Sequence, residues 1–166
     1  MGASGFLFIL CLVILFTLLG TLLWDKSPKD VAGRWFAVGQ GNASIGWSDD
    51  GKTWTAGLDG DGNNPLGTNG IGNGVYSKDG FFIFFGKEQD GTAGNNIHWS
   101  EDGKTWTAGT GDMYGTETNA TANHIIYHNN RWISGGKPAT TGVKKITTST
   151  DGKAWTDTTT AVFFIN

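Results

Sequence analysis

The chain has 166 residues, of which 27 are glycine and eight are tryptophan, and only 16% are Asp, Glu, Lys or Arg. This length allows one modest domain with an appendage, and the composition favours short strands and turns over a helical bundle. The formal net charge of -3 lacks the basic surplus of nucleic-acid-binding proteins, so we expect no nucleic-acid partner.

The first 24 residues contain no charged side chain, and the chain is almost continuously apolar from Phe6 to Trp24. A helix of this length spans roughly 28 Å, which matches the hydrocarbon thickness of a bilayer. A cleaved signal peptide would carry a basic start, a shorter apolar run and a small-residue cleavage site. We therefore predict that residues 1–24 form a retained, single-pass transmembrane anchor in a lipid bilayer.

The charges that flank this segment predict its orientation. Lys26, Lys29 and Arg34 follow it and no basic side chain precedes it, which places the remainder of the chain on the cytosolic side. The single cysteine, Cys11, lies inside the apolar segment, which agrees with a reducing compartment. Two glycosylation sequons would indicate the opposite side if they were occupied: Asn42-Ala43-Ser44 and Asn119-Ala120-Thr121.

Residues 25–33 have the composition of a polar linker, and residues 34–166 are organised by a motif that occurs three times. The motif reads Ser-x-Asp-Gly-Lys-x-Trp, and we call it the box motif. Its serines fall 52 and then 49 residues apart, a period typical of stacked or radial repeats. Its defining residues are Ser48, Asp50, Gly51, Trp54; Ser100, Asp102, Gly103, Trp106; and Ser149, Asp151, Gly152, Trp155.

Each residue of the box motif has a physical role in folding. Asp-Gly between two strand segments predicts a hairpin turn, because glycine readily adopts a positive φ. The Ser and Asp side chains can accept hydrogen bonds from the N–H groups of the turn. The tryptophan begins the returning strand and can bury a large area against a neighbouring sheet. We therefore interpret the motif as mainly structural.

The box motif resembles the Asp-box, also called the BNR repeat, of sialidases and many other β-propeller proteins. The resemblance implies a propeller-like fold in which each box lies on the turn between the last two strands of a blade. In that family the box usually lies away from the catalytic face, so the resemblance specifies no activity.

Short strands are predicted on both sides of each box. The preceding segments Trp35–Gly39, Phe82–Gly86 and Trp132–Gly136 run from an aromatic residue to a glycine and predict buried strands. Turn pairs within Val75–Phe81 and Ile126–Trp132 predict a further hairpin in the second and third repeats.

The predicted fold is all-β, with three repeats of a four-stranded antiparallel sheet after the N-terminal helix. The first repeat lacks its first strand, and we expect Thr160–Ile165 to complete that sheet beside Arg34–Val38. The three repeats then close within one chain. Alternatively, two chains exchange terminal strands and form a six-bladed ring.

No catalytic constellation is evident in the sequence. A sialidase clamps its substrate carboxylate with three arginines, whereas this chain has only Arg34 and Arg131. Glycoside hydrolysis by paired carboxylates stays open, although most aspartates are explained by turns. The sequence has no thiol outside the apolar segment and no Gly-x-Ser-x-Gly elbow. We therefore predict that the protein is not an enzyme.

We expect no cofactor and no metal ion, after weighing two possible metal sites. His124 and His128 would lie on one face of a strand, but about 13 Å apart, too far to share one ion. Asp59, Asp61 and Asn63 resemble the opening of a calcium loop. They are a weak calcium candidate because Gly70 stands where an EF-hand has its glutamate.

We predict a non-enzymatic, membrane-anchored structural or interaction protein that links a protein layer to a membrane, with other proteins of a larger assembly as partners. One setting is the virion of a large DNA virus with an internal membrane, where it would be a minor capsid protein. The alternative is a cell-surface glycan-binding or glycoside-hydrolase-like domain, because aromatic-rich β surfaces bind sugars. The tryptophans recur at repeat positions, which favours packing between sheets over contact with a glycan.

Overall fold

The computed structural model describes residues 33–87, 96–111, 114, 120–138 and 145–158, which belong to one compact unit, Ala32–Asn166. The predicted anchor at 1–24, the linker except for Gly33, and the predicted closing strand at 160–165 lie outside these residues. Among the residues that are described, no helix has the length and apolar character needed to cross a bilayer.

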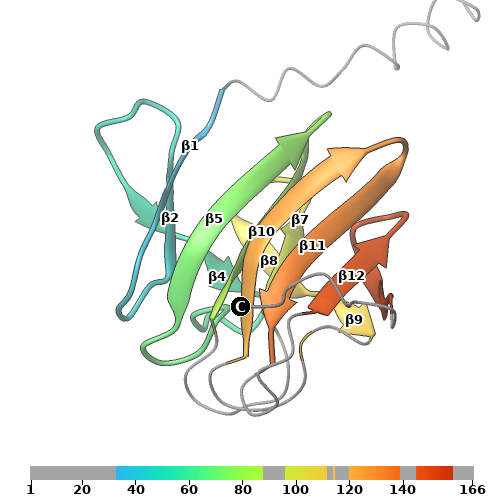
Figure 1. Cartoon of the computed structure of the whole chain (residues 1–166). Coiled ribbons are helices and arrows are strands. Elements are labelled where there is room, and N and C mark those ends of the chain that lie inside the picture. Colours follow the sequence, from blue (N-terminus) through green and yellow to red (C-terminus); the bar gives the residue numbers. More distant parts are fainter. Residues whose placement is uncertain (1–32, 88–95, 112–113, 115–119, 139–144, 159–166) are drawn as a thin grey trace, which may run out of the picture. The chain divides into compact units, whose positions relative to one another are not determined.

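Regular structure in the described residues consists of strands alone, which confirms the all-β prediction (Figure 1). The strands are β1 (Trp35–Val38), β2 (Ile45–Ser48), β3 (Thr55–Ala56), β4 (Leu58–Asp59), β5 (Ile71–Lys78), β6 (Phe81–Lys87), β7 (Ile97–Ser100), β8 (Thr105–Ala108), β9 (Thr110–Gly111), β10 (Thr121–His128), β11 (Arg131–Lys137), β12 (Lys145–Ser149) and β13 (Ala154–Asp157).

These strands form a small sheet and a large one. The small sheet has the order β1-β2-β3. The ten-stranded sheet has the order β4-β8-β7-β6-β10-β11-β12-β13-β9, with β5 also paired to β6, and it curls as it passes from one hairpin to the next (Figure 1). It is mixed because β4 pairs with β8, and β9 with β13, in parallel.

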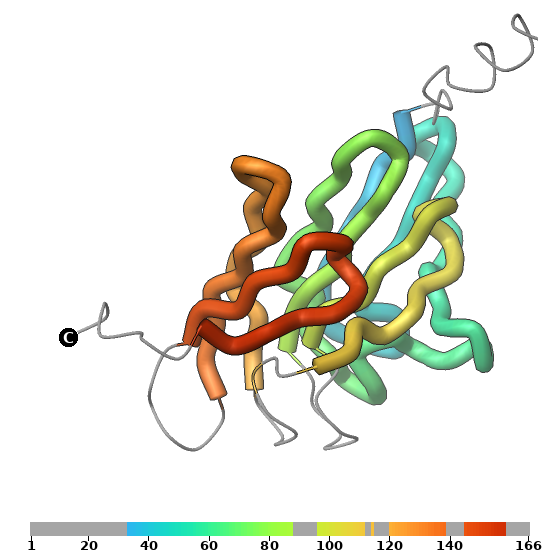
Figure 2. The backbone as a smooth tube through the Cα atoms, turned by 90° about the vertical axis from the view of Figure 1, so that its right-hand side faces the viewer, coloured from blue at the N-terminus to red at the C-terminus, as the bar shows by residue number. Residues whose placement is uncertain are grey.

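The strand pairing follows the sequence repeat. We call β1–β3 repeat 1, β5–β8 repeat 2 and β10–β13 repeat 3; repeats 2 and 3 are each a four-stranded antiparallel meander. The three hairpins that carry the boxes lie one after another in Figure 2, in teal, yellow and red. The predicted sheets are not fully separate, because Thr121 of β10 pairs with Lys87 of β6.

The two hairpins predicted upstream of the boxes are present. Asp79 and Gly80 have φ of 50° and 78°, and Asn129 and Asn130 have φ of 49° and 57°. Two successive residues with positive φ match the right-handed twist of the flanking strands. These turns set the register of β5 with β6 and of β10 with β11.

Each repeat has two faces, which we name by the neighbour they contact. Phe36 of β1 contacts Phe82 and Trp106 of repeat 2, with ring centroids 5.2 and 6.0 Å apart, so it lies on the forward face of repeat 1. Phe82 and Trp106 lie on the backward face of repeat 2. Because side chains alternate along a strand, Trp35 lies on the backward face of repeat 1.

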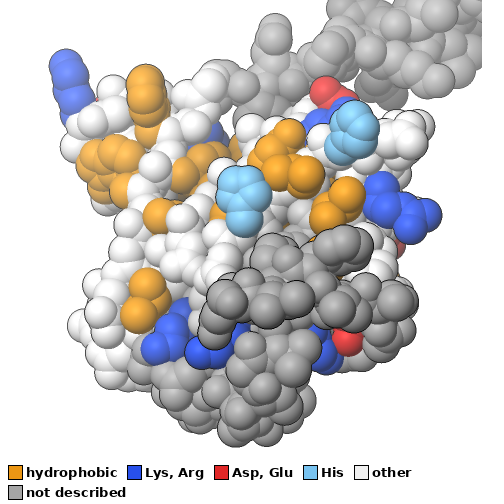
Figure 3. Space-filling model, in the orientation of Figure 1, with side chains coloured by type: hydrophobic (Ala, Val, Ile, Leu, Met, Phe, Trp, Pro, Cys, Tyr) orange, Lys and Arg blue, Asp and Glu red, His pale blue; other side chains and the backbone are white. Residues whose placement is uncertain are grey.

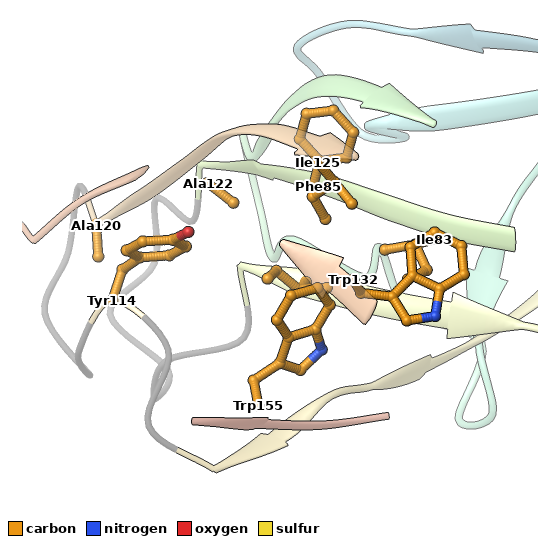
Figure 4. Packing of buried hydrophobic residues seen from close by; sticks show 9 residues of the cluster. Ile83, Phe85, Tyr114, Ala120, Ala122, Ile125, Trp132 and Trp155 are labelled. Atoms are coloured by element: carbon orange, nitrogen blue, oxygen red, sulfur yellow. The ribbon is translucent and has the colours of Figure 1, made fainter. Parts of the chain in front are cut away.

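The same arrangement buries the core between repeats 2 and 3 (Figure 4). Ile83 on the forward face of repeat 2 belongs to one buried cluster with Trp132 and Trp155 on the backward face of repeat 3. Tyr114 closes the cluster, and its hydroxyl donates to Ser134 Oγ at 2.7 Å. Packing of one repeat against the next therefore forms the core.

The prediction that all three aromatic strands are buried is wrong for the first. Trp35 exposes 62% of its surface, whereas Phe82 and Trp132 each expose 4%. These residues are equivalent, because each pairs with the serine of its own box. The physical reason is the absence of a neighbour, since no described residue forms a sheet against the backward face of repeat 1.

Candidate functional site

The box motif is a closed network of hydrogen bonds inside its own turn. In repeat 1, Ser48 Oγ donates to Asp50 Oδ1 at 2.9 Å and accepts from the Gly51 N–H at 2.9 Å. Asp50 Oδ1 also accepts from the N–H groups of Lys52 and Thr53, at 2.8 and 2.7 Å. The glycine has φ of 72°. Both polar side chains are therefore used in shaping the hairpin.

The other two boxes repeat this network. The bond from the glycine N–H to serine Oγ is 2.8 Å long in both, at Gly103 and at Gly152. Asp102 accepts from the N–H groups of Lys104 and Thr105, and Asp151 accepts from those of Lys153 and Ala154. The same network is thus present in all three repeats, including the first, which packs on no preceding repeat among the described residues.

These bonds hold the box carboxylates in the ionised form. The N–H groups of Thr53 and Lys52 lower the pKa of Asp50, and those of Ala154 and Lys153 lower the pKa of Asp151. For Asp102 the partial burial raises the pKa, but the N–H groups of Lys104 and Thr105 outweigh it, so the net pKa is lowered. A carboxyl that is ionised at neutral pH cannot serve as a general acid.

The box lysines join neighbouring repeats, a role that was not predicted from the sequence. Lys104 Nζ lies 4.6 Å from the ring centroid of Trp47 in repeat 1. Lys153 Nζ lies 4.0 Å from that of Trp99 in repeat 2 and 2.9 Å from Glu101 Oε1. Cation–π contacts of this kind favour close docking of sheets. The available signal was the lysine that follows glycine in every box.

Among the described residues, the lysine of the first box has no such contact, and its face is open. Trp54 exposes 46% of its surface, whereas Trp106 is fully buried and Trp155 exposes 2%. Lys52 is exposed. A shallow hollow of about 320 Å³ beside Trp54 is lined by Ala37, Gly46 and Ala56 among others. Hydrophobic side chains gather over β1 and β2 in the space-filling view (Figure 3). This open backward face is the candidate functional site.

The loop that was weighed as a weak calcium candidate is held by its own hydrogen bonds. Asp59 Oδ1 accepts from the N–H groups of Asp61 and Asn63, at 3.0 and 2.7 Å. Asn64, which follows, accepts from Ser44 and Leu66 and donates to the Gly41 carbonyl at 3.1 Å. In the part of the chain that is described, no three His, Cys, Asp or Glu side chains lie close enough to hold a metal ion.

The three histidines differ in their surroundings. His124 and His128 of β10 are exposed. His98 of β7 is buried, and this burial lowers its pKa to about 4, although the Asp59 charge acts in the opposite direction. Ile97 points into the cluster between repeats 2 and 3, so His98, the next residue, points towards repeat 1. His98 is therefore a neutral core residue at pH 7.

Comparisons of this chain with family models, with curated proteins and with solved structures find no match. The box side chains are engaged in their turns, and the unusual surface is the open backward face of repeat 1.

Proposed function

We propose that this protein is a non-enzymatic, membrane-anchored structural or interaction protein, and that its β-repeat domain links a protein layer to the membrane. The backward face of repeat 1 is the docking surface. The anchor at 1–24, the cytosolic orientation and a place in a virion shell as a minor capsid protein are parts of this proposal that rest on the sequence.

The observation that carries the proposal is the exposure of Trp35 and Trp54 on one face of one sheet. At the equivalent positions, Phe82 and Trp106 pack against repeat 1, where both rings contact Phe36. The open face thus has the residues of a packed junction, and aromatic residues are those that dominate binding at interfaces. Monomeric proteins rarely leave such residues clustered on the surface without a function.

We further propose that the three repeats are Asp-box blades of a propeller-like fold, and that residues 160–165 complete repeat 1. Two observations support the blade interpretation. The box lies on the turn between the last two strands of each repeat, and each repeat packs face to face on the next. The strands equivalent to β1 are β6 and β11, and each is paired along one edge, with β5 and β10 respectively. A strand beside β1 would cover the corresponding edge of β1.

Membranes from cells that naturally contain the full chain provide the test. We expect the protein to resist alkaline carbonate, as an anchored protein does, and to stay with sedimenting protein after detergent dissolves the lipid. A Trp35→Ser/Trp54→Ser variant should stay in the membrane but enter the detergent-soluble fraction. The change removes two exposed side chains and leaves the core between the repeats intact.

Ile126→Ser is the matched control, because Ile126 exposes 41% of its surface on β10, outside repeat 1. It should behave as the wild type does. Release of the wild-type chain by detergent as freely as the double variant would contradict docking through this face. Release by carbonate alone would contradict the anchor.

Glycan binding is the second candidate function, and the tryptophan beside a shallow hollow favours it, because sugar rings stack on exposed aromatic side chains. A glycan array probed with the full chain in detergent should then give a signal that Trp54→Ser abolishes. A signal that this variant leaves unchanged would dismiss the open face as a glycan site.

A further inference from the structure

The three repeats end in two unlike surfaces. The backward face of repeat 1 carries Trp35, Trp54 and the exposed Lys52. The forward face of repeat 3 carries Arg131, which is exposed, and Ile133, which is half-buried. What these faces can bind follows from how the same positions are used at the two internal junctions.

Three contacts recur at the internal junctions. First, the strand aromatic of one repeat packs on the preceding repeat, as Phe82 does on Phe36 at 5.2 Å and Trp132 on Phe81 at 5.9 Å. Second, the box lysine lies over a tryptophan of the preceding repeat. Third, the box turn rests against a side chain at the start of the preceding aromatic strand. At the first junction, Arg34 Nη1 donates to the Asp102 carbonyl, and at the second the ring of Phe81 lies against Gly152.

The forward face of repeat 3 reproduces two of these three partners. By register with the box, Ile133 stands where Phe36 and Ile83 stand, because each lies directly after the residue that pairs with the box serine. Arg131 stands where Arg34 and Phe81 stand by the same register. In the part of the chain that is described, Arg131 has no hydrogen bond and no ion pair. Its guanidinium can therefore donate to a box carbonyl, as Arg34 does, or stack on a tryptophan ring.

The remaining positions on the forward face of repeat 3 differ from those at the internal junctions. The differences would weaken a junction at this face without preventing it. Thr148 stands where Trp47 and Trp99 stand, and Thr150 stands where Glu101 binds Lys153. Because threonine replaces tryptophan, a hollow of about 460 Å³ opens there, lined by Arg131, Thr148 and Thr156 among others. A lysine entering this hollow would meet threonine hydroxyl groups and the Asp151 carboxylate, which its own turn already engages, instead of a tryptophan ring and a free glutamate.

We propose that the backward face of repeat 1 docks on the forward face of repeat 3 of a second copy of this chain. Trp35 then contacts Ile133 and Arg131 of the other copy, and Lys52 enters the hollow beside Thr148 and Thr150. Two copies joined in this way at both ends hold six repeats, within the four to eight blades typical of closed propellers. A head-to-tail contact that did not close would extend into an array.

This inference deepens the proposed function, because it names the partner of the docking face and explains how copies would assemble into a layer at a membrane. The contact lacks the cation–π contact that both internal junctions have and the ion pair that joins repeats 2 and 3. Association therefore depends on concentration, which allows it to be measured.

The test is sedimentation velocity of the full chain in density-matched detergent over a wide range of protein concentration. We expect a reversible equilibrium between one copy and a larger species. Trp35→Ser/Trp54→Ser should weaken it at least about tenfold, because central aromatic residues dominate interfaces. Ile126→Ser should leave it unchanged, since this residue lies on neither docking face.

A substitution that strengthens association tests which residues meet across the contact between the two copies. Thr150→Glu recreates the acid that Glu101 provides for Lys153, so it should tighten association about two- to fivefold, the range of an exposed ion pair. Lys52→Ala should cancel this gain, because the new carboxylate would have lost its partner. The single change Lys52→Ala should have a smaller effect than the double tryptophan change, since the native hollow offers Lys52 hydroxyl groups and an Asp151 carboxylate that its own turn engages.

A chain that stays monomeric at all concentrations, including with Thr150→Glu, would overturn the inference. So would association that the double tryptophan variant leaves unchanged, because the contact would then lie elsewhere, as in the apolar segment. Tightening by Thr150→Glu that persists with Lys52→Ala would exclude this register. None of these outcomes depends on membrane retention, which is measured in the separate extraction experiment.

Discussion

Trp106 and Trp54 occupy the same position in two box motifs, yet one is fully buried and the other exposes 46% of its surface. The turns that present them are alike, with serine–glycine bonds of 2.8 and 2.9 Å. The difference lies in the neighbour, because Trp106 packs on Phe36 and Gly57 of the preceding segment, whereas no repeat precedes repeat 1 in the described residues. The box thus shapes a hairpin, and the adjacent repeat buries its indole.

Replacing the box tryptophans gives the largest expected effect. Trp106→Ala and Trp155→Ala should each lower the free energy of unfolding by about 3–5 kcal/mol, as large buried aromatics do. Trp54→Ala should cost less than about 1 kcal/mol, because its ring already meets solvent. Urea unfolding of the full chain in mild detergent, followed by circular dichroism, measures both. Equal losses at Trp54 and Trp106 would mean that repeat 1 is also covered.

The junction between repeats 1 and 2 should respond to pH through His98. Its pKa is lowered to about 4 by burial, so between pH 6.5 and about 4 the unfolded chain binds a proton that the folded chain does not. Stability should therefore fall as the pH is lowered through this window, by up to about 3 kcal/mol. His98→Thr, which copies Thr147 of repeat 3, should remove this slope in urea unfolding at pH 7 and pH 5.

His124→Thr is the control for this titration, because His124 is exposed on β10. It should leave the dependence on pH as it is in the wild type. An unchanged slope in the His98 variant would show that other groups carry the effect.

Substitution of a box glycine should cost more at an internal junction than at the open backward face of repeat 1. A Cβ on Gly152 would lie 2.6 Å from Phe81, whereas on Gly51 its nearest atom is 3.6 Å away. Both have positive φ, so alanine costs about 1 kcal/mol at either position. Gly152→Ala should cost about 2 kcal/mol more, because of overpacking at the junction. Thermal unfolding of the two variants measures the difference, and equal costs would contradict it.

Substitution of the box serines should give the smallest difference in stability between repeat 1 and repeat 2. Ser48 and Ser100 are both buried and make the same bonds within their turns. Ser48→Ala and Ser100→Ala should each cost about 1–2 kcal/mol, because the glycine N–H loses its partner. Nearly equal losses in urea unfolding are expected. A much smaller loss at Ser48 would show that the turn itself depends on the neighbouring repeat.

The sequence predicts the local parts of this structure well. The box turns and the Asp79-Gly80 and Asn129-Asn130 hairpins depend on residues within a few positions of each other. A periodic motif with glycine at fixed places therefore indicates them. The all-β class follows from the same signals. The short parallel strands β4 and β9, which were not predicted, also have a sequence signal, since each follows a glycine, Gly57 or Gly109, that recurs at the box period.

The sequence could not predict which tryptophans are buried. Trp54 and Trp106 have the same local sequence, and only the presence or absence of a preceding repeat separates them. The candidate site was missed for this reason, because recurrence at repeat positions suggested packing at all of them. The burial of His98 was also missed. Its neighbours on the backward face of repeat 2 come from another repeat, so short-range patterns do not reveal them.

Oxidative footprinting of the full chain at low protein concentration tests the central claim most directly, because it reads the solvent access of each tryptophan separately. The account predicts that Trp35 and Trp54 are oxidised much faster than Trp106, Trp132 and Trp155, and that raising the protein concentration protects only the first two. Equal protection of all five tryptophans in the dilute chain would contradict it.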